Sequence, residues 1–184
     1  MVKTFPGTTI EISKLEKGSS LLLFDGIFAT GGITLSQISV MTGLEPYLIQ
    51  NWVKRGFLSS PVKRVYSREQ FSRIVIINML RESLQLEKIC GLIHLIGGKP
   101  DNKEDDLIGF EELYHRYVDM IADQDINITD EASVMKAIEK ATDQFECSPF
   151  DAKKQLIRVL QVMIYAHASA RLRASAEQAF SAME

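Results

Sequence analysis

The sequence predicts an all-α fold with one short β-hairpin. Apolar residues recur three or four positions apart through most of the chain, which is the period of an amphipathic helix. Residues that favour helix starts, such as Thr34 and Ser67, stand just before these patterns, and glycines follow several of them. The segment 62–66 combines β-branched and aromatic residues with adjacent turn residues, so we expect the hairpin there.

A short helix is expected directly after Thr34. The Thr34 hydroxyl can accept a hydrogen bond from a free amide in the first turn, which makes this residue a candidate N-cap. Leu35, Ile38 and Met41 are spaced to share one buried face. Gly43 can adopt the positive φ of a sharp turn, so the helix should end there.

A second helix is expected from Pro46, because proline lacks the amide that would be unpaired in a first turn, and Glu45 suits the positive end of the helix dipole. Its apolar side carries Leu48, Ile49, Trp52 and Val53. Its opposite side carries Tyr47, Gln50, Asn51 and Lys54. The Gln50 and Asn51 amides could make paired hydrogen bonds to an adenine edge, since a helix fits the DNA major groove. An ordinary amphipathic helix with a solvated face has the same pattern.

A basic hairpin follows the second helix. The helix closes within Arg55–Leu58 at a glycine, and Lys63 and Arg64 then lie side by side in a short turn-and-strand segment. Two adjacent cations beside a polar helix suit contact with phosphate groups. Ser67 and Gln70 form a predicted capping box that opens the next helix.

Several residues between 33 and 96 occur in a specific order: Ile38, Thr42-Gly43-Leu44, Ile49, Trp52, Arg55-Gly56-Phe57-Leu58, Arg64-Val65-Tyr66-Ser67 and Leu86-Glu87-Lys88-Ile89. With these residues the segment resembles the DNA-binding domain of MerR-type transcriptional regulators, and the whole chain is similar to a family of bacterial proteins that carry such a domain. The resemblance implies a winged helix-turn-helix. Gln50 stands where an arginine is usual, the hairpin is several residues shorter than the usual wing, and the wing's glycine-tyrosine pair is missing.

We therefore expect a DNA-binding transcriptional regulator that reads double-stranded DNA, acts as a homodimer through its C-terminal helices and has no catalytic activity. The expected DNA contacts are Tyr47, Gln50, Asn51, Lys54, Arg55, Lys63 and Arg64. Two alternatives stay open: a protein-protein interaction module that docks through the same helices, and a small-ligand sensor that binds its ligand in the C-terminal helical domain. The sequence indicates no particular effector.

The charge is unevenly distributed along the chain. The formal net charge is −3, yet residues 1–80 contain nine Lys and Arg against five Asp and Glu, whereas residues 81–184 contain twelve against nineteen. A cationic N-terminal part suits phosphate, and an acidic remainder discourages nonspecific coating of DNA. Two distant cysteines and the lack of a signal-peptide pattern favour the cytoplasm, and no apolar run is long enough to predict a membrane span.

Three parts are expected along the chain: an N-terminal arm, residues 1–32, packed on the body; the winged helix-turn-helix domain, 33–98; and a helical C-terminal dimerisation or effector domain, 107–184. The segment Thr9–Lys17 fits either strand or helix, and the apolar cluster 21–28 should form a helix against the C-terminal half. The acidic segment Asp101–Asp106 is expected to be a solvated loop. The last helix should start at Ser148-Pro149, with a core-forming first half and an alanine-rich second half suited to a dimer contact.

The sequence contains no phosphate-binding glycine loop, nucleophile elbow or paired zinc-ligand motif, so we expect no cofactor and no metal. Cys90 and His94 are four apart on one expected helix, but two ligands are too few for a metal site. A group of aromatic and methionine residues in the C-terminal half could line an apolar effector pocket, although a helical core needs the same residue types. These residues are Phe110, Tyr114, Tyr117, Met120, Met135, Met163 and Tyr165.

Overall fold

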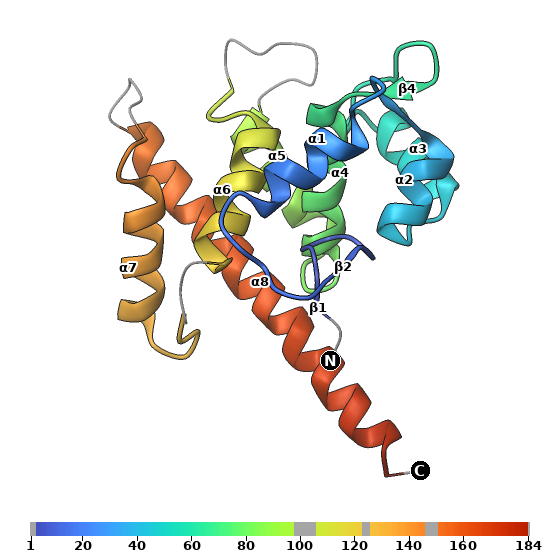
Figure 1. The fold of residues 1–184 in the computed structure, drawn as a ribbon. Helices are drawn as coiled ribbons and strands as arrows, with labels where there is room; N and C mark the ends of the chain where they lie inside the picture. Colours follow the sequence, from blue (N-terminus) through green and yellow to red (C-terminus); the bar gives the residue numbers. More distant parts are fainter. Residues whose placement is uncertain (1–2, 98–105, 123–125, 146–150, 184) are drawn as a thin grey trace.

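The computed structural model describes residues 3–97, 106–122, 126–145 and 151–183, and this part of the chain is mainly helical, as expected (Figure 1). The helices are α1 (Ser19–Ile27), α2 (Leu35–Thr42), α3 (Pro46–Lys54), α4 (Arg68–Arg81), α5 (Leu86–Gly97), α6 (Phe110–Ala122), α7 (Glu131–Thr142) and α8 (Asp151–Ser181). Two short antiparallel strand pairs accompany them: β1 (Lys3–Thr4) with β2 (Glu11–Ile12), and β3 (Ile33–Thr34) with β4 (Val65–Tyr66). No helix in the described ranges is long and apolar enough to cross a membrane.

Helix α4 lies at the centre of the fold. Its start is fixed by the predicted capping box, in which Ser67 Oγ accepts from the Gln70 amide and Gln70 Oε1 accepts from the Ser67 amide. Every residue from Phe71 to Ile77 is buried, because α2, α5, α6 and α8 all pack against this helix. The sequence pattern indicated a central position for the first half of the last helix. In α8 that half buries one face and leaves Val162 exposed, so α4 is the more enclosed helix.

The N-terminal arm forms a hairpin and a helix. The segment that fitted either strand or helix contains β2, which pairs with β1. Helix α1 packs on α6 as expected, with the fully buried Phe24 ring stacked 5.4 Å from the Tyr114 ring. The apolar cluster 21–28 is not buried throughout, since the Leu22 side chain is 74% exposed on α1. One face of α1 therefore packs on the core and the opposite face is exposed to solvent.

The C-terminal helices continue the same core. Helix α6 packs on α4 and α7, and α7 packs on α8, so the helices on either side of residues 98–105 share one hydrophobic cluster. The Asp130 carboxylate caps α7, accepting from the amides of Ala132 and Ser133. Every residue from Arg171 to Met183 is exposed, and this end of α8 extends away from the other helices (Figure 1). The expected start of the last helix at Ser148-Pro149 and most of the expected acidic loop lie outside the described residues.

Candidate functional site

Helices α2 and α3 pack against each other across a three-residue turn, 43–45. At the start of α2, the Thr34 hydroxyl accepts from the Gln37 amide at 3.4 Å and the Thr34 amide donates to Gln37 Oε1 at 2.8 Å. Gly43 ends α2 with a φ of 69°, where a side chain would strain the backbone, and its amide donates to the Ser39 carbonyl. Local capping therefore fixes both ends of α2 and the direction of α3.

Helix α3 is anchored through one face and exposed on the other. Ile49 and Trp52 are buried in the core, so Trp52 has the packing role that its place in the pattern predicted. The predicted contact residues of this helix and its C-cap are all exposed: Tyr47, Gln50, Asn51, Lys54 and Arg55. Within the described residues, none of these five side chains makes a hydrogen bond or an ion pair, and Arg55 lies over the Phe57 ring at 4.7 Å. Their polar groups are thus available to a partner.

A two-residue turn carries the two predicted phosphate contacts. Val62 and Val65 exchange both backbone hydrogen bonds, at 3.2 and 2.9 Å, so Lys63 and Arg64 form the exposed tip of a tight hairpin, called here the wing (residues 62–65). Both tip residues have positive φ, 51° for Lys63 and 65° for Arg64. A two-residue hairpin turn of this kind favours asparagine and glycine, so two cations at these positions strain the backbone.

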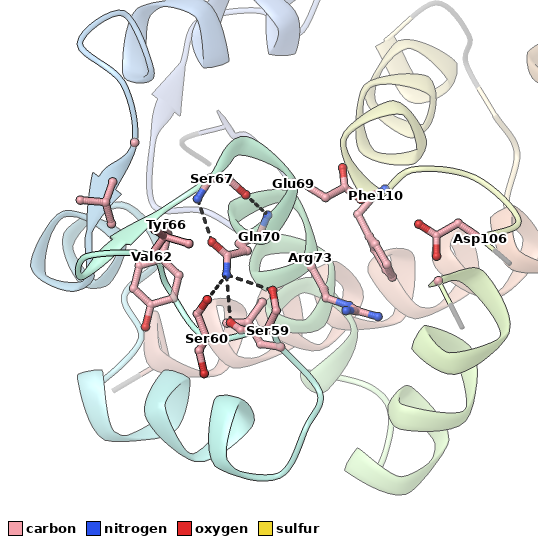
Figure 2. A pocket seen from close by; sticks show the side chains of 14 residues that line it. Ser59, Ser60, Val62, Tyr66, Ser67, Glu69, Gln70, Arg73, Asp106 and Phe110 are labelled. Carbon is pink, nitrogen blue, oxygen red and sulfur yellow. Dashed lines mark hydrogen bonds between the residues drawn. The ribbon is translucent and has the colours of Figure 1, made fainter. Parts of the chain in front are cut away.

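The wing is tied to α2 and α4. Strand β4 continues from the wing and pairs with β3, which leads directly into α2. On the α4 side, Gln70 Nε2 donates to the Ser59 carbonyl, the Ser59 hydroxyl and the Ser60 carbonyl at 2.9, 3.0 and 3.2 Å (Figure 2). The predicted capping residue Gln70 therefore also fixes the loop that leads to the wing. Nothing local in the sequence indicates this second role, because the partners are ten and eleven residues away.

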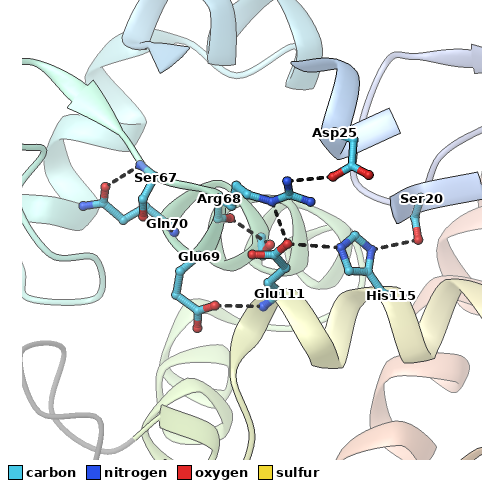
Figure 3. A network of polar contacts seen from close by, with 9 residues as sticks. Ser20, Asp25, Ser67, Arg68, Glu69, Gln70, Glu111 and His115 are labelled. Atoms are coloured by element: carbon cyan, nitrogen blue, oxygen red, sulfur yellow. Dashed lines mark hydrogen bonds and ion pairs between the residues drawn. The ribbon is translucent and has the colours of Figure 1, made fainter. Parts of the chain in front are cut away.

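A polar network joins α1, α4 and α6 behind this surface (Figure 3). The Arg68 guanidinium contacts Asp25 at 2.8 Å and Glu111 at 2.7 Å. The hydrogen bond to Asp25 and the contact with Glu111 raise the pKa of Arg68, although partial burial opposes them. His115 Nδ1 lies 2.9 Å from the Ser20 hydroxyl, and burial lowers the pKa of His115. The network holds α1 and α6 against the N-terminal end of α4.

The other candidate groups lie elsewhere. Phe110, Tyr114 and Tyr117 are buried core residues, as are Met120 and Met163, whereas Met135 is partly buried and Tyr165 is exposed on α8, so most of this group belongs to the hydrophobic core. Cys90 is partly buried, which raises the pKa of its thiol. In the ranges that the structure describes, no three or more His, Cys, Asp and Glu side chains are grouped to hold a metal ion.

A family model described as "Domain of unknown function (DUF1836)" matches residues 30–117. This range begins just before β3 and ends within α6, so it contains α2, α3, the wing, α4 and α5. No curated protein and no solved structure matches the chain. The matched range thus includes both the exposed face of α3 and the helices that hold it in place.

Proposed function

We propose that this chain is a cytoplasmic, non-enzymatic regulator of transcription that binds double-stranded DNA through a MerR-like winged helix-turn-helix formed by α2, α3, the wing and α4. The observation that carries this function is that seven polar or cationic side chains on α3 and the wing are exposed and have no hydrogen bond or ion pair within the described residues. Exposed side chains without partners inside the protein are expected at an interface with a large polar molecule, because their donors and acceptors are free to bind it.

Helix α3 would enter the major groove with its exposed face. Gln50 and Asn51 are adjacent in the chain and carry amide groups that can pair with the N6 and N7 atoms of adenine. Lys54 lies one turn further on and can reach a phosphate or a guanine edge. Ile49 and Trp52 hold the opposite face in the core, so the side chains would meet the DNA from a rigid helix.

The wing supports a phosphate contact beside this helix. Each non-glycine residue with left-handed backbone angles costs roughly 1 to 2 kcal/mol, and the wing has two in succession. Asparagine or glycine would remove much of this strain without changing the fold. Placing Lys63 and Arg64 there instead brings two positive charges to the most exposed part of the hairpin, where they could neutralise phosphates and fix the register of α3.

A homodimer would let two such surfaces bind two half-sites. The exposed end of α8, from Arg171 to Met183, is the segment that we propose as the dimer contact. It carries Leu172 and Phe180, both largely exposed, among small alanine residues that permit close helix approach. Dimerisation would double the number of phosphate contacts and make affinity depend on half-site spacing.

A protein partner is the second candidate function, and a specific observation favours it. Val40, Tyr47 and Val62 lie on α2, α3 and the wing and are 75%, 64% and 74% exposed. Exposed apolar side chains on these three elements would suit a protein interface as well as contacts with thymine methyl groups. Binding to a protein through these residues would respond weakly to salt, whereas binding to DNA would respond strongly.

Selection of bound fragments from sheared genomic DNA by the purified full chain tests the function directly. We expect a recurrent sequence motif, and we expect Gln50→Ala and Asn51→Ala to relax the preference at one position each by roughly 1 to 3 kcal/mol. Lys88→Ala, an exposed cation on α5, serves as the control and should retain the wild-type motif. Recovery of random fragments by the wild-type chain, or an unchanged motif in both amide variants, would remove the base-reading role of α3.

A further inference from the structure

A pocket of about 510 Å³ lies between the wing, the start of α4, the end of α5 and the start of α6 (Figure 2). This volume is in the range of sites for small organic ligands. Its apolar wall includes Leu58, Val65 and the Phe110 ring. Its polar lining includes Ser59, Ser67, Gln70, Arg73, Glu69 and Asp106. The pocket therefore has an apolar wall and a polar wall around one cavity.

Arg73 is the unusual member of this lining. Its side chain is only 6% exposed, and its guanidinium points into the space beside Phe110 and Asp106 (Figure 2). Nε is fully buried and has no hydrogen-bond partner, and within the described residues the guanidinium makes no hydrogen bond or ion pair. Burial lowers the pKa of Arg73, and the nearby charges of Asp106 and Glu69 offset only part of this effect, so a charged donor without a hydrogen bond is unfavourable here. An arginine in this position is therefore short of an acceptor.

The contacts that Arg73 does make leave its donors available. The Phe110 ring lies 4.3 Å from the guanidinium carbon and covers one face of the group. Guanidinium hydrogen bonds form in the plane of the group, so stacking on that face does not use them. The nearby Glu69 does not pair with Arg73 because its two oxygens accept from the Phe110 and Glu111 amides, at 2.5 and 3.0 Å.

Two serine hydroxyls add to the donors of the pocket. Ser59 Oγ accepts from Gln70 Nε2 at 3.0 Å, and Ser67 Oγ accepts from the Gln70 amide at 3.2 Å. Within the described residues neither hydroxyl donates to a protein acceptor, so each has its proton to offer. The polar wall therefore presents donors at Ser59, Ser67 and Arg73, and the ligand that complements it is rich in acceptors.

We propose that this pocket binds a small organic monocarboxylate, with its carboxylate on the Nη1 and Nη2 edge of the Arg73 guanidinium, since Nε is buried, and with its apolar portion against Phe110 and Leu58. Planar carboxylate oxygens match the paired donors of arginine. Glu69 and Asp106 also line the pocket, so a ligand with a single negative charge is repelled less than a phosphate dianion. No residue of α3 lines this pocket, so it is separate from the proposed base-reading face, although it borders the wing through Val62 and Val65.

Nuclear magnetic resonance of the ¹⁵N-labelled full chain, without DNA, tests the site with benzoate as the probe. We expect benzoate to shift the Arg73 Nε–Hε signal saturably, and inorganic phosphate at equal ionic strength to shift it much less. A signal that responds to phosphate as strongly as to benzoate would refute the monocarboxylate class. A signal that moves with neither probe, or equally with chloride, would show that solvent alone satisfies Arg73 and would overturn the site.

Variants separate the pocket from the general charge of the protein. Arg73→Lys keeps the charge but removes Nε and the paired donors, so benzoate affinity should fall roughly tenfold or more. Ser59→Ala should weaken benzoate binding several-fold, and it leaves Gln70 its two carbonyl acceptors. This variant tests the pocket if Arg73→Lys fails to fold. Arg81→Lys, at the exposed other end of α4, is the matched control and should bind as wild type. Wild-type affinity in both pocket variants would overturn the assignment.

Discussion

The strained wing makes a prediction in which stability and DNA affinity change in opposite directions. The double substitution Lys63→Asn with Arg64→Gly introduces the residue pair that a two-residue turn with positive φ favours. Relief of strain contributes roughly 1 to 2 kcal/mol per residue, and the greater unfolded-state entropy of glycine offsets about 0.5 to 1 kcal/mol. For the two residues together we expect the free energy of unfolding to rise by about 1 to 3 kcal/mol.

The same change removes two cations from the proposed DNA surface. For a chain of this size the added stability should raise the Tm by roughly 2 to 12 °C, measured by circular dichroism. In fluorescence anisotropy with a selected duplex, the slope of log affinity against log salt should become shallower by about 1.8 per wing. The exchanged pair Lys63→Arg with Arg64→Lys keeps both charges and should change neither quantity. A double variant that is less stable than wild type would refute the strain reasoning, and an unchanged slope would refute the phosphate contact.

Two further predictions concern stability. Burial and the positive charge of Arg171 lower the pKa of His167 to about 4, so the folded state resists a proton that the unfolded state accepts near pH 6.5. This contribution to stability is complete above pH 6.5 and is lost as the pH falls to about 4, by about 3 kcal/mol at most. Urea unfolding at pH 7.5 and at pH 4.5 measures the loss. His167→Gln should make the free energy of unfolding less dependent on pH. A Cβ at Gly97 would overlap the buried Phe110 ring, so Gly97→Ala should destabilise the fold by roughly 1 to 3 kcal/mol. Gly91→Ala on the same helix meets no neighbour and should stabilise by about 0.5 to 1 kcal/mol; a loss of stability in both variants would argue against a specific close contact between Gly97 and the Phe110 ring.

Helix starts could be predicted from the sequence because capping acts over three or four residues. Ser67 caps α4 as predicted, and Pro46 opens α3. The apolar spacing likewise identified Trp52 as a core residue. These features depend on neighbours along the chain, so their physics is contained in a short segment.

The sequence could not predict features that depend on distant segments. Glu69 accepts from the first amides of α6, more than forty residues away, and so joins α4 to α6. The apolar spacing of each helix gives no sign of this contact. Arginine is normally a surface residue, and Arg73 is buried only because α5 and α6 close over α4. The hairpin at 62–66 was predicted, but the positive φ angles of its turn were not, since Lys63 and Arg64 are poor residues for positive φ and the hairpin geometry overrides their preference.

The salt dependence of DNA affinity for the full chain tests the central claim most directly. The exposed cations of α3, its C-cap and the wing are Lys54, Arg55, Lys63 and Arg64, and four phosphate contacts correspond to a slope of about −3.6 in log affinity against log salt for each bound chain. We predict a slope near this value for one chain and about twice that for a dimer. Failure to bind any selected or genomic duplex at low salt, or an affinity that stays constant as salt rises, would contradict DNA binding through this surface.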